Sequence, residues 1–221
     1  MTSHDKPFPM TRGAWAMLAI PLGIALTGLL ASESMHLERF LGIRLASYIV
    51  PVGGLVLGLM CALLLRRGHI RIARRLVLIY LLFAAIDLAS GVALLVLQLT
   101  SYRGSEGGLR LLSDSVLLWL TNILIFALIY WMLDAGLWSK TGQRQRRHFF
   151  FPQELDSLPG YENWQPGLFS YTFLAFTVST TYGPTDMPAA SPGAKLLVMV
   201  QAAIALALFT LTIARAVSII G

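Results

Sequence analysis

A stripe of hydroxyl groups in the last quarter of the chain is the first feature that can do chemistry. Thr177, Thr180 and Thr181 are spaced i, i+3 and i+4, so they share one face of a helix. Gly183 and Asp186 follow directly. A row of oxygen atoms with an acid at its mouth attracts cations, so the pattern predicts part of a path for a small cation or a proton.

The same stripe has a second interpretation, which the sequence leaves open. Hydroxyls in a membrane helix can bond the backbone carbonyls of their own helix instead of lining a polar cavity. The helix would then end at Tyr182-Gly183-Pro184, and Asp186 would cap the next short turn.

Asp87 is the second feature, because it lies near the middle of an apolar run from 76 to 99. A charge at the centre of a bilayer costs roughly 2.5–3.5 kcal/mol, so such a residue normally faces the interior of a helix bundle and is a functional candidate. Asp87 is predicted either to handle protons or ions or to hold two helices together, for instance by pairing with Thr27.

Enzyme and cofactor motifs are missing from the sequence. There is no His-Glu-x-x-His, no Gly-x-Ser-x-Gly, no Gly-x-Gly-Asp and no phosphate-binding loop. The four histidines are scattered among different loops, which argues against a metal site: His4, His36, His69 and His148. We therefore expect no enzyme, no cofactor, and no catalytic or metal-binding residues.

Long apolar blocks must position the polar residues. Of the 221 residues, 56% are hydrophobic and 13% are charged, whereas a soluble protein has about 25% charge. A helix rises about 1.5 Å per residue and the hydrocarbon layer is about 30 Å thick, so roughly 20 apolar residues make one crossing. Five blocks meet that length: 14–32, 46–65, 76–99, 116–138 and 194–219. The sequence predicts an all-α, polytopic transmembrane helix bundle, with residues 1–221 as a single integral membrane domain.

Basic residues cluster in two loops and predict the orientation of the chain. Five arginines lie between residues 66 and 75, and Lys140 and three arginines lie between 140 and 147. Loops rich in Lys and Arg stay in the cytoplasm, so both loops and the N-terminus are predicted to be cytoplasmic. The net charge of +6 follows from these loops, which contact anionic headgroups, and nucleic acid is not an expected partner.

The stretch 167–183 decides the number of crossings. Residues 139–166, before it, are aromatic and proline-broken and are predicted to lie along the cytoplasmic membrane interface. If 167–183 crosses, the chain has about six spans and a cytoplasmic C-terminus. If it re-enters, the C-terminus and Arg215 lie outside. The distribution of Lys and Arg favours the crossing.

Other polar and small residues inside the apolar blocks are expected to serve packing. Asn122 and Gln201 are predicted to donate interhelical hydrogen bonds, and Asp134 to pair with the basic loop that follows it. Gly54 and Gly58 form a small-xxx-small face that favours close helix packing.

Thr180, Thr181, Gly183 and Asp186 are followed by the last apolar block. This order resembles the pore of tetrameric potassium channels, in which a hydroxyl-rich helix leads to a Thr-Thr-x-Gly-Tyr-Gly-Asp filter and then to an inner helix. The four residues match that motif, whereas its Tyr and its second Gly are replaced by proline and threonine. A filter lined by carbonyls needs the backbone freedom of glycine, so potassium selectivity is not expected.

A second resemblance covers most of the C-terminal half. Four short segments follow one another: Phe126 to Tyr130, Phe151-Pro152, Tyr171 to Phe173, and Thr180 to Asp186. The pattern resembles an uncharacterised family of short multi-span membrane proteins, a bacterial domain of unknown function. The resemblance implies a fold and a place in the bacterial inner membrane, but no activity.

Two functions remain open on the sequence. The first is a conduit or transporter for a small cation or proton, which would use Asp87 and the residues from 177 to 186. The second is a non-catalytic partner subunit or scaffold in the cell membrane. In both, the chain contacts the lipid bilayer, together with further copies of itself or another membrane protein.

Overall fold

The computed structural model describes residues 21–27, 46–67, 69–101, 105–134, 148–154, 159–160, 164, 166–183 and 186–220. In chain order its named helices are α3 (Ala46–Arg66), α4 (Ile70–Ser101), α5 (Ser105–Asp134), the short 3-10 helix η2 (Pro152–Glu154), α6 (Leu168–Thr181) and α7 (Pro192–Ile220). Residues 21–27 are also helical. Within these ranges there is no strand, so the predicted all-α class is confirmed.

Three helices contain stretches long and apolar enough to cross a membrane: Arg75–Ala93 in α4, Ser113–Asp134 in α5 and Pro192–Ala214 in α7. α3 contributes a shorter apolar stretch, Val52–Leu64. These helices fit a membrane protein. The predicted count of about six spans is not confirmed, because α6 has only 14 residues. Most of the predicted span 14–32 and much of the interfacial segment 139–166 lie outside the described residues.

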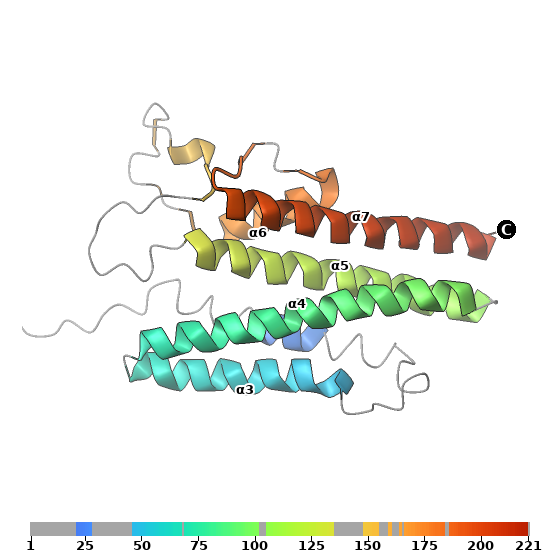
Figure 1. Ribbon diagram of the computed structural model, residues 1–221, viewed down its shortest axis with the longest axis horizontal. Helices are drawn as coiled ribbons and strands as arrows, with labels where there is room; N and C mark the ends of the chain where they lie inside the picture. Colours follow the sequence, from blue (N-terminus) through green and yellow to red (C-terminus); the bar gives the residue numbers. More distant parts are fainter. Residues whose placement is uncertain are drawn as a thin grey trace, which may run out of the picture.

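The four long helices lie side by side along their length (Figure 1). α4 packs against α3 on one side and against α5 and α7 on the other. The chain reverses between α3 and α4 within a few residues, where the His69 N–H donates to the Leu64 carbonyl at 2.9 Å. Such a short connection makes the two helices antiparallel neighbours.

Gly54 lets α4 approach α3 closely. A Cβ atom at position 54 would lie 2.6 Å from the Tyr80 hydroxyl and 2.9 Å from the Pro21 carbonyl oxygen. Gly58 was predicted to share this role, yet a Cβ atom there would meet no described atom within 4 Å. Only Gly54 is therefore needed for the contact between α3 and α4.

α6 runs antiparallel to α5. Tyr171, near the start of α6, donates a hydrogen bond to Asp134, the last residue of α5, at 2.8 Å. Ser179, near the end of α6, accepts a hydrogen bond from Asn122 at 3.4 Å. At about 1.5 Å per residue, Asn122 lies roughly 18 Å along α5 from Asp134. α6 therefore ends level with the middle of the apolar stretch of α5.

α7 runs parallel to α6, so both helices begin at the same end of the bundle. Gln201 of α7 donates to Ser179 of α6 at 3.0 Å, and the Phe209 ring lies 6.5 Å from the Tyr182 ring. Residue numbers thus rise together in the two helices. The chain between them must return from the far end of α6 to the near end, as Figure 1 shows.

The returning segment pairs with part of the predicted interfacial segment. Phe149 and Ala189 form an isolated antiparallel bridge, in which Phe150 N–H donates to the Pro188 carbonyl at 3.1 Å. The Ala190 N–H donates to the His148 carbonyl at 2.7 Å. This pairing closes the end of the bundle where α5 ends and where α6 and α7 begin.

An aromatic cluster fills that end. The Phe149 ring lies 4.8 Å from the Tyr130 ring, and the Phe151 ring lies 5.2 Å from Tyr171 and 5.7 Å from Trp164. Phe149 and Phe151 are buried, so this part of the predicted interfacial segment is packed into the protein. It anchors the positions from which α6 and α7 start.

Candidate functional site

The predicted hydroxyl stripe lies on α6, and each hydroxyl donates to a carbonyl of the same segment. The Thr177 hydroxyl donates to the Leu174 carbonyl at 2.8 Å and the Thr180 hydroxyl to the Phe176 carbonyl at 3.0 Å. The Thr181 hydroxyl lies 2.7 Å from the Thr177 carbonyl. Thr180 and Thr181 are exposed, whereas Thr177 is half-buried. Because each proton is already donated, the exposed oxygens can only accept hydrogen bonds or contact cations.

α6 ends where the sequence predicted. Tyr182 has φ 58° and ψ 21°, the left-handed conformation that often closes a helix. A residue with a Cβ atom pays about 1–2 kcal/mol for it, and the contact between its ring and Phe209 offsets part of that cost. The Thr181 hydroxyl also reaches the Gly183 carbonyl at 2.7 Å.

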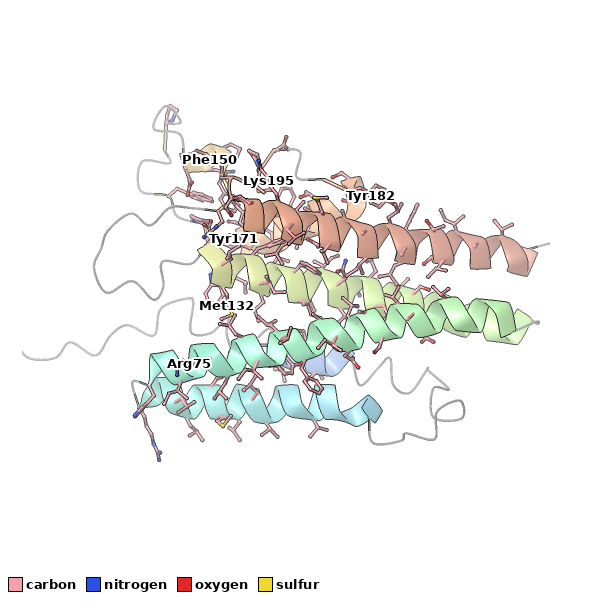
Figure 2. The ribbon with its side chains drawn as sticks, viewed as in Figure 1. Arg75, Met132, Phe150, Tyr171, Tyr182 and Lys195 are labelled. Atoms are coloured by element: carbon pink, nitrogen blue, oxygen red, sulfur yellow. The ribbon has the colours of Figure 1, made fainter. Side chains whose placement is uncertain are left out.

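Asp186 lies just beyond this end and is exposed. Pro184 and Thr185, the two departures from the channel motif, lie outside the described residues. Figure 2 shows Tyr171 near the end of the bundle and Tyr182 farther along α7, toward its middle. The stripe thus lies in the last turns of α6 and Gly183 directly after them, at the C-terminal end of the helix, termed here its inner end. Asp186 follows Gly183 by three residues of sequence.

A chain of buried polar side chains joins α5, α6 and α7. The Tyr130 hydroxyl donates to Gln201 Oε1 at 2.6 Å, and Gln201 Nε2 donates to the Ala175 carbonyl at 2.8 Å and to Ser179 Oγ at 3.0 Å. Asn122 Nδ2 donates to the same Ser179 Oγ at 3.4 Å. The predicted interhelical roles of Asn122 and Gln201 are confirmed.

Asn122 also holds an unused acceptor. Its side chain is 0% exposed, and its Oδ1 accepts no hydrogen bond from any described residue. This acceptor lies level with the end of α6, because its amide nitrogen contacts Ser179.

Asp134 joins the ends of three segments. Its Oδ2 accepts from the Tyr171 hydroxyl at 2.8 Å, and its Oδ1 accepts from the His148 backbone N–H at 2.5 Å. The His148 ring contacts Ser191 Oγ at 2.7 Å through Nδ1, and Ser191 Oγ accepts from the Ala194 N–H at 3.2 Å at the start of α7. The basic loop with which Asp134 was predicted to pair lies outside the described residues.

Ser191, His148 and Asp134 do not form a catalytic triad. In a triad the carboxylate binds the second ring nitrogen of the histidine and orients the imidazole. Here Asp134 binds the backbone N–H of His148, and the serine oxygen caps a helix. The arrangement fits a structural clasp between the three segments.

Asp87 lies apart from the stripe, on the exposed surface of α4. The Ser90 hydroxyl donates to its backbone carbonyl at 2.7 Å. The sequence suggested Thr27 as a partner of Asp87. The Thr27 hydroxyl instead donates to carbonyls of its own helix and accepts from the Thr121 hydroxyl at 3.2 Å. Among the described residues no hydrogen bond joins the Asp87 side chain to Thr27 or to α6.

No family model, curated protein or solved structure matches the chain. Among the described residues no group of three or more His, Cys, Asp or Glu side chains is placed to hold a metal ion. The candidate site therefore rests on the geometry of α5, α6 and α7.

The sequence missed Tyr130, Ser179 and Tyr171 as polar partners. Each is an ordinary residue type for an apolar helix, and the hydrogen bonds described above join residues at least 22 positions apart in sequence. The spacing of Asn122, Tyr130 and Asp134 at intervals of four or eight residues is the one sequence signal that places them near one face of α5.

Proposed function

We propose that the protein is a multi-pass membrane protein that conducts a small cation, and that the inner end of α6 lines its path. The observation that carries this proposal is a helix that stops level with the middle of α5 and leaves polar groups exposed there. Thr180, Thr181 and Asp186 are all exposed around that end.

The depth of the α6 end in the membrane makes the exposure of these polar groups significant. Non-helical backbone within the hydrocarbon layer persists only where protein buries it or where it lines a water-filled cavity. α6 ends about 18 Å inward from Asp134, close to the middle of a layer about 30 Å thick. Tyr182, directly after Thr181, is exposed and Gly183 is half-buried, so an aqueous path beside them accounts for their exposure.

The polar groups at this end suit a cation. The threonine oxygens present lone pairs outward, because their protons bond backbone carbonyls. The C-terminus of a helix carries about half a negative charge, and Asp186 adds a full one. Anions find no matching donors among these groups.

The proposed topology has five crossings and one re-entrant segment. The chain enters at Leu168, turns after Thr181 and returns to Ser191 before α7 crosses. The N-terminus is then cytoplasmic and the C-terminus is outside, in the membrane of a bacterial cell. The order of the elements resembles the pore of potassium channels, in which a short helix and a returning segment stand between an outer and an inner helix. In this protein the re-entrant segment opens toward the side of the basic loops.

Cysteine labelling tests the re-entrant topology. In a Cys61→Ala background, Arg67→Cys and Ala190→Cys should react with an impermeant maleimide from the same side of the membrane. Val217→Cys, near the end of α7, should react from the opposite side. If α6 crossed instead, Ala190→Cys would react from the side opposite to Arg67→Cys, and Val217→Cys would react from the same side as Arg67→Cys. That result would show the proposed topology to be wrong.

Ion flux tests the proposed activity. Purified protein in liposomes should dissipate a K⁺, Na⁺ or proton gradient. A unit charge about 4 Å from a passing cation contributes about 1 kcal/mol even in water, so Asp186→Asn should reduce that flux about fivefold. Thr181→Val should also reduce it, because it removes an exposed oxygen.

The matched control is Thr210→Val. Thr210 is an exposed threonine of α7 whose hydroxyl donates to the Leu206 carbonyl at 2.8 Å, the same arrangement away from the end of α6. Its replacement should leave flux unchanged. Folded protein that dissipates none of the three gradients would refute the conduit and favour the non-catalytic partner subunit.

A further inference from the structure

The buried amide of Asn122 is only partly used by the polar chain between α5, α6 and α7. Its side chain is 0% exposed, and its bond from Nδ2 to Ser179 Oγ is 3.4 Å long. Typical bonds of this kind measure about 2.9–3.0 Å, so the contact is weak. Its Oδ1 accepts no hydrogen bond from any described residue. A buried acceptor without a partner is costly and rare, so a group that donates to Oδ1 is needed.

Ser179 holds the complementary group. Its Oγ accepts from Asn122 Nδ2 and, at 3.0 Å, from Gln201 Nε2. A serine hydroxyl has two lone pairs and one proton, so both lone pairs are occupied and the proton remains to be donated. No described residue accepts that proton in a hydrogen bond. An unused donor and an unused acceptor thus lie on two side chains in contact, one on α6 and one on α5.

The charge at this point favours a neutral partner. The three side chains that meet here are uncharged: Asn122, Ser179 and Gln201. Two N–H groups already point at Ser179 Oγ, which opposes a cation there, and Asn122 Oδ1 cannot bond an anion. Burying an ion without a counter-charge also costs far more than burying a neutral group that is hydrogen-bonded. The partner must therefore be small, neutral and able both to donate and to accept.

We propose that Asn122 and Ser179 bind one water molecule inside the bundle, between α5 and α6. The water donates to Asn122 Oδ1 and accepts from the Ser179 hydroxyl, so each unused group gains a partner. Buried waters in proteins typically make about three hydrogen bonds to polar groups that lack other partners, and two of them are accounted for here. The proposal does not depend on the proposed conduit.

The water explains how the end of α6 is held against α5. At the start of α6, the Tyr171 hydroxyl donates to Asp134 at 2.8 Å. At its end, the direct bond between Asn122 and Ser179 is 3.4 Å long. A bridging water is nearly as good enthalpically as a direct hydrogen bond, so it adds a second link where the direct one is weak. Both ends of α6 are then bonded to α5.

Solid-state NMR of the protein in liposomes tests for the water. The chain contains two asparagines, Asn122 and Asn163, so labelling the asparagine side chains gives two amide signals, and Asn122→Leu assigns the one that it removes. Because the bound water lies within hydrogen-bond distance of the Asn122 amide, magnetisation should pass from water to this amide. The transfer should be about threefold faster, or more, than to a buried amide whose groups are all paired.

Gln201 is the control amide, because it is equally buried. It is 0% exposed, its oxygen accepts from Tyr130, and its nitrogen donates to the Ala175 carbonyl and to Ser179. Gln201→Met assigns its signal in protein labelled at glutamine. Ser179→Cys keeps the size of the side chain but weakens its donor, so it should slow the transfer to Asn122, while circular dichroism confirms the fold. Transfer to Asn122 no faster than to Gln201 would overturn the proposal, and so would a rate that Ser179→Cys leaves unchanged.

Discussion

Gln201→Met should lower the free energy of unfolding by about 2–4 kcal/mol. Gln201 is 0% exposed and forms three hydrogen bonds, one from Tyr130 and two to α6. Interhelical hydrogen bonds in membranes contribute about 0.6 kcal/mol each on average and up to about 1.7 kcal/mol. Methionine matches the unbranched shape of glutamine, so packing changes little and the loss reports the hydrogen bonds.

The measurement is reversible unfolding in mixed micelles. Tyr130→Phe removes one bond and should cost about 1 kcal/mol, and the double variant should cost less than the two single variants together. Thr210→Val removes a hydroxyl of α7 that bonds only its own helix, and it should change stability by less than about 0.5 kcal/mol. A similarly small change for Gln201→Met would mean that apolar packing alone joins the three helices.

The sequence predicted half of this polar chain. An amide within an apolar block stands out by its composition, so Asn122 and Gln201 were identified as interhelical donors. Their partners were not, because Ser179 and Tyr130 are ordinary residues in such helices. Their role depends on the register between helices 22 to 71 residues apart in sequence. Spacing along one helix carries no information about that register.

The stripe on α6 shows the same limit. Its spacing predicted a shared helical face, and the structure confirms the helix and its end at Tyr182. The sequence could not predict whether 167–183 crosses the membrane or re-enters, because its length is barely enough for a crossing. Contacts to Asp134 at one end and to Asn122 at the other determine that direction.

Asp87 illustrates a different limit. Its apolar surroundings identified it as unusual, and the cost of a buried charge led to the expectation of a bundle interior. Which side of α4 faces the neighbouring helices depends on where Gly54 and Gly91 admit side chains of other helices. Asp87 lies two turns after Tyr80, the residue that packs against Gly54, so it borders the packed side of α4 and is still exposed.

Asp134→Ala should lower the free energy of unfolding by about 2–4 kcal/mol. The carboxylate accepts from the Tyr171 hydroxyl and from the His148 N–H, and hydrogen bonds to charged groups contribute about 1.5–3 kcal/mol each. Two effects make the expected loss of stability smaller than the sum of these two hydrogen bonds. His148 is half-buried, so water replaces part of its bond, and an acid at a helix C-terminus opposes the helix dipole by about 0.5 kcal/mol.

The variant should also loosen the end from which α6 and α7 start. In Asp134→Ala, the exposed position Ala190→Cys should react faster with a maleimide than it does beside the native Asp134, because His148 no longer anchors the returning segment. Asp134→Asn retains one acceptor and should lose about half as much stability. Asp186→Ala removes the same charge from an exposed site and should lose almost none. Equal losses for Asp134→Ala and Asp186→Ala would show that net charge, and not the clasp around Asp134, determines the effect.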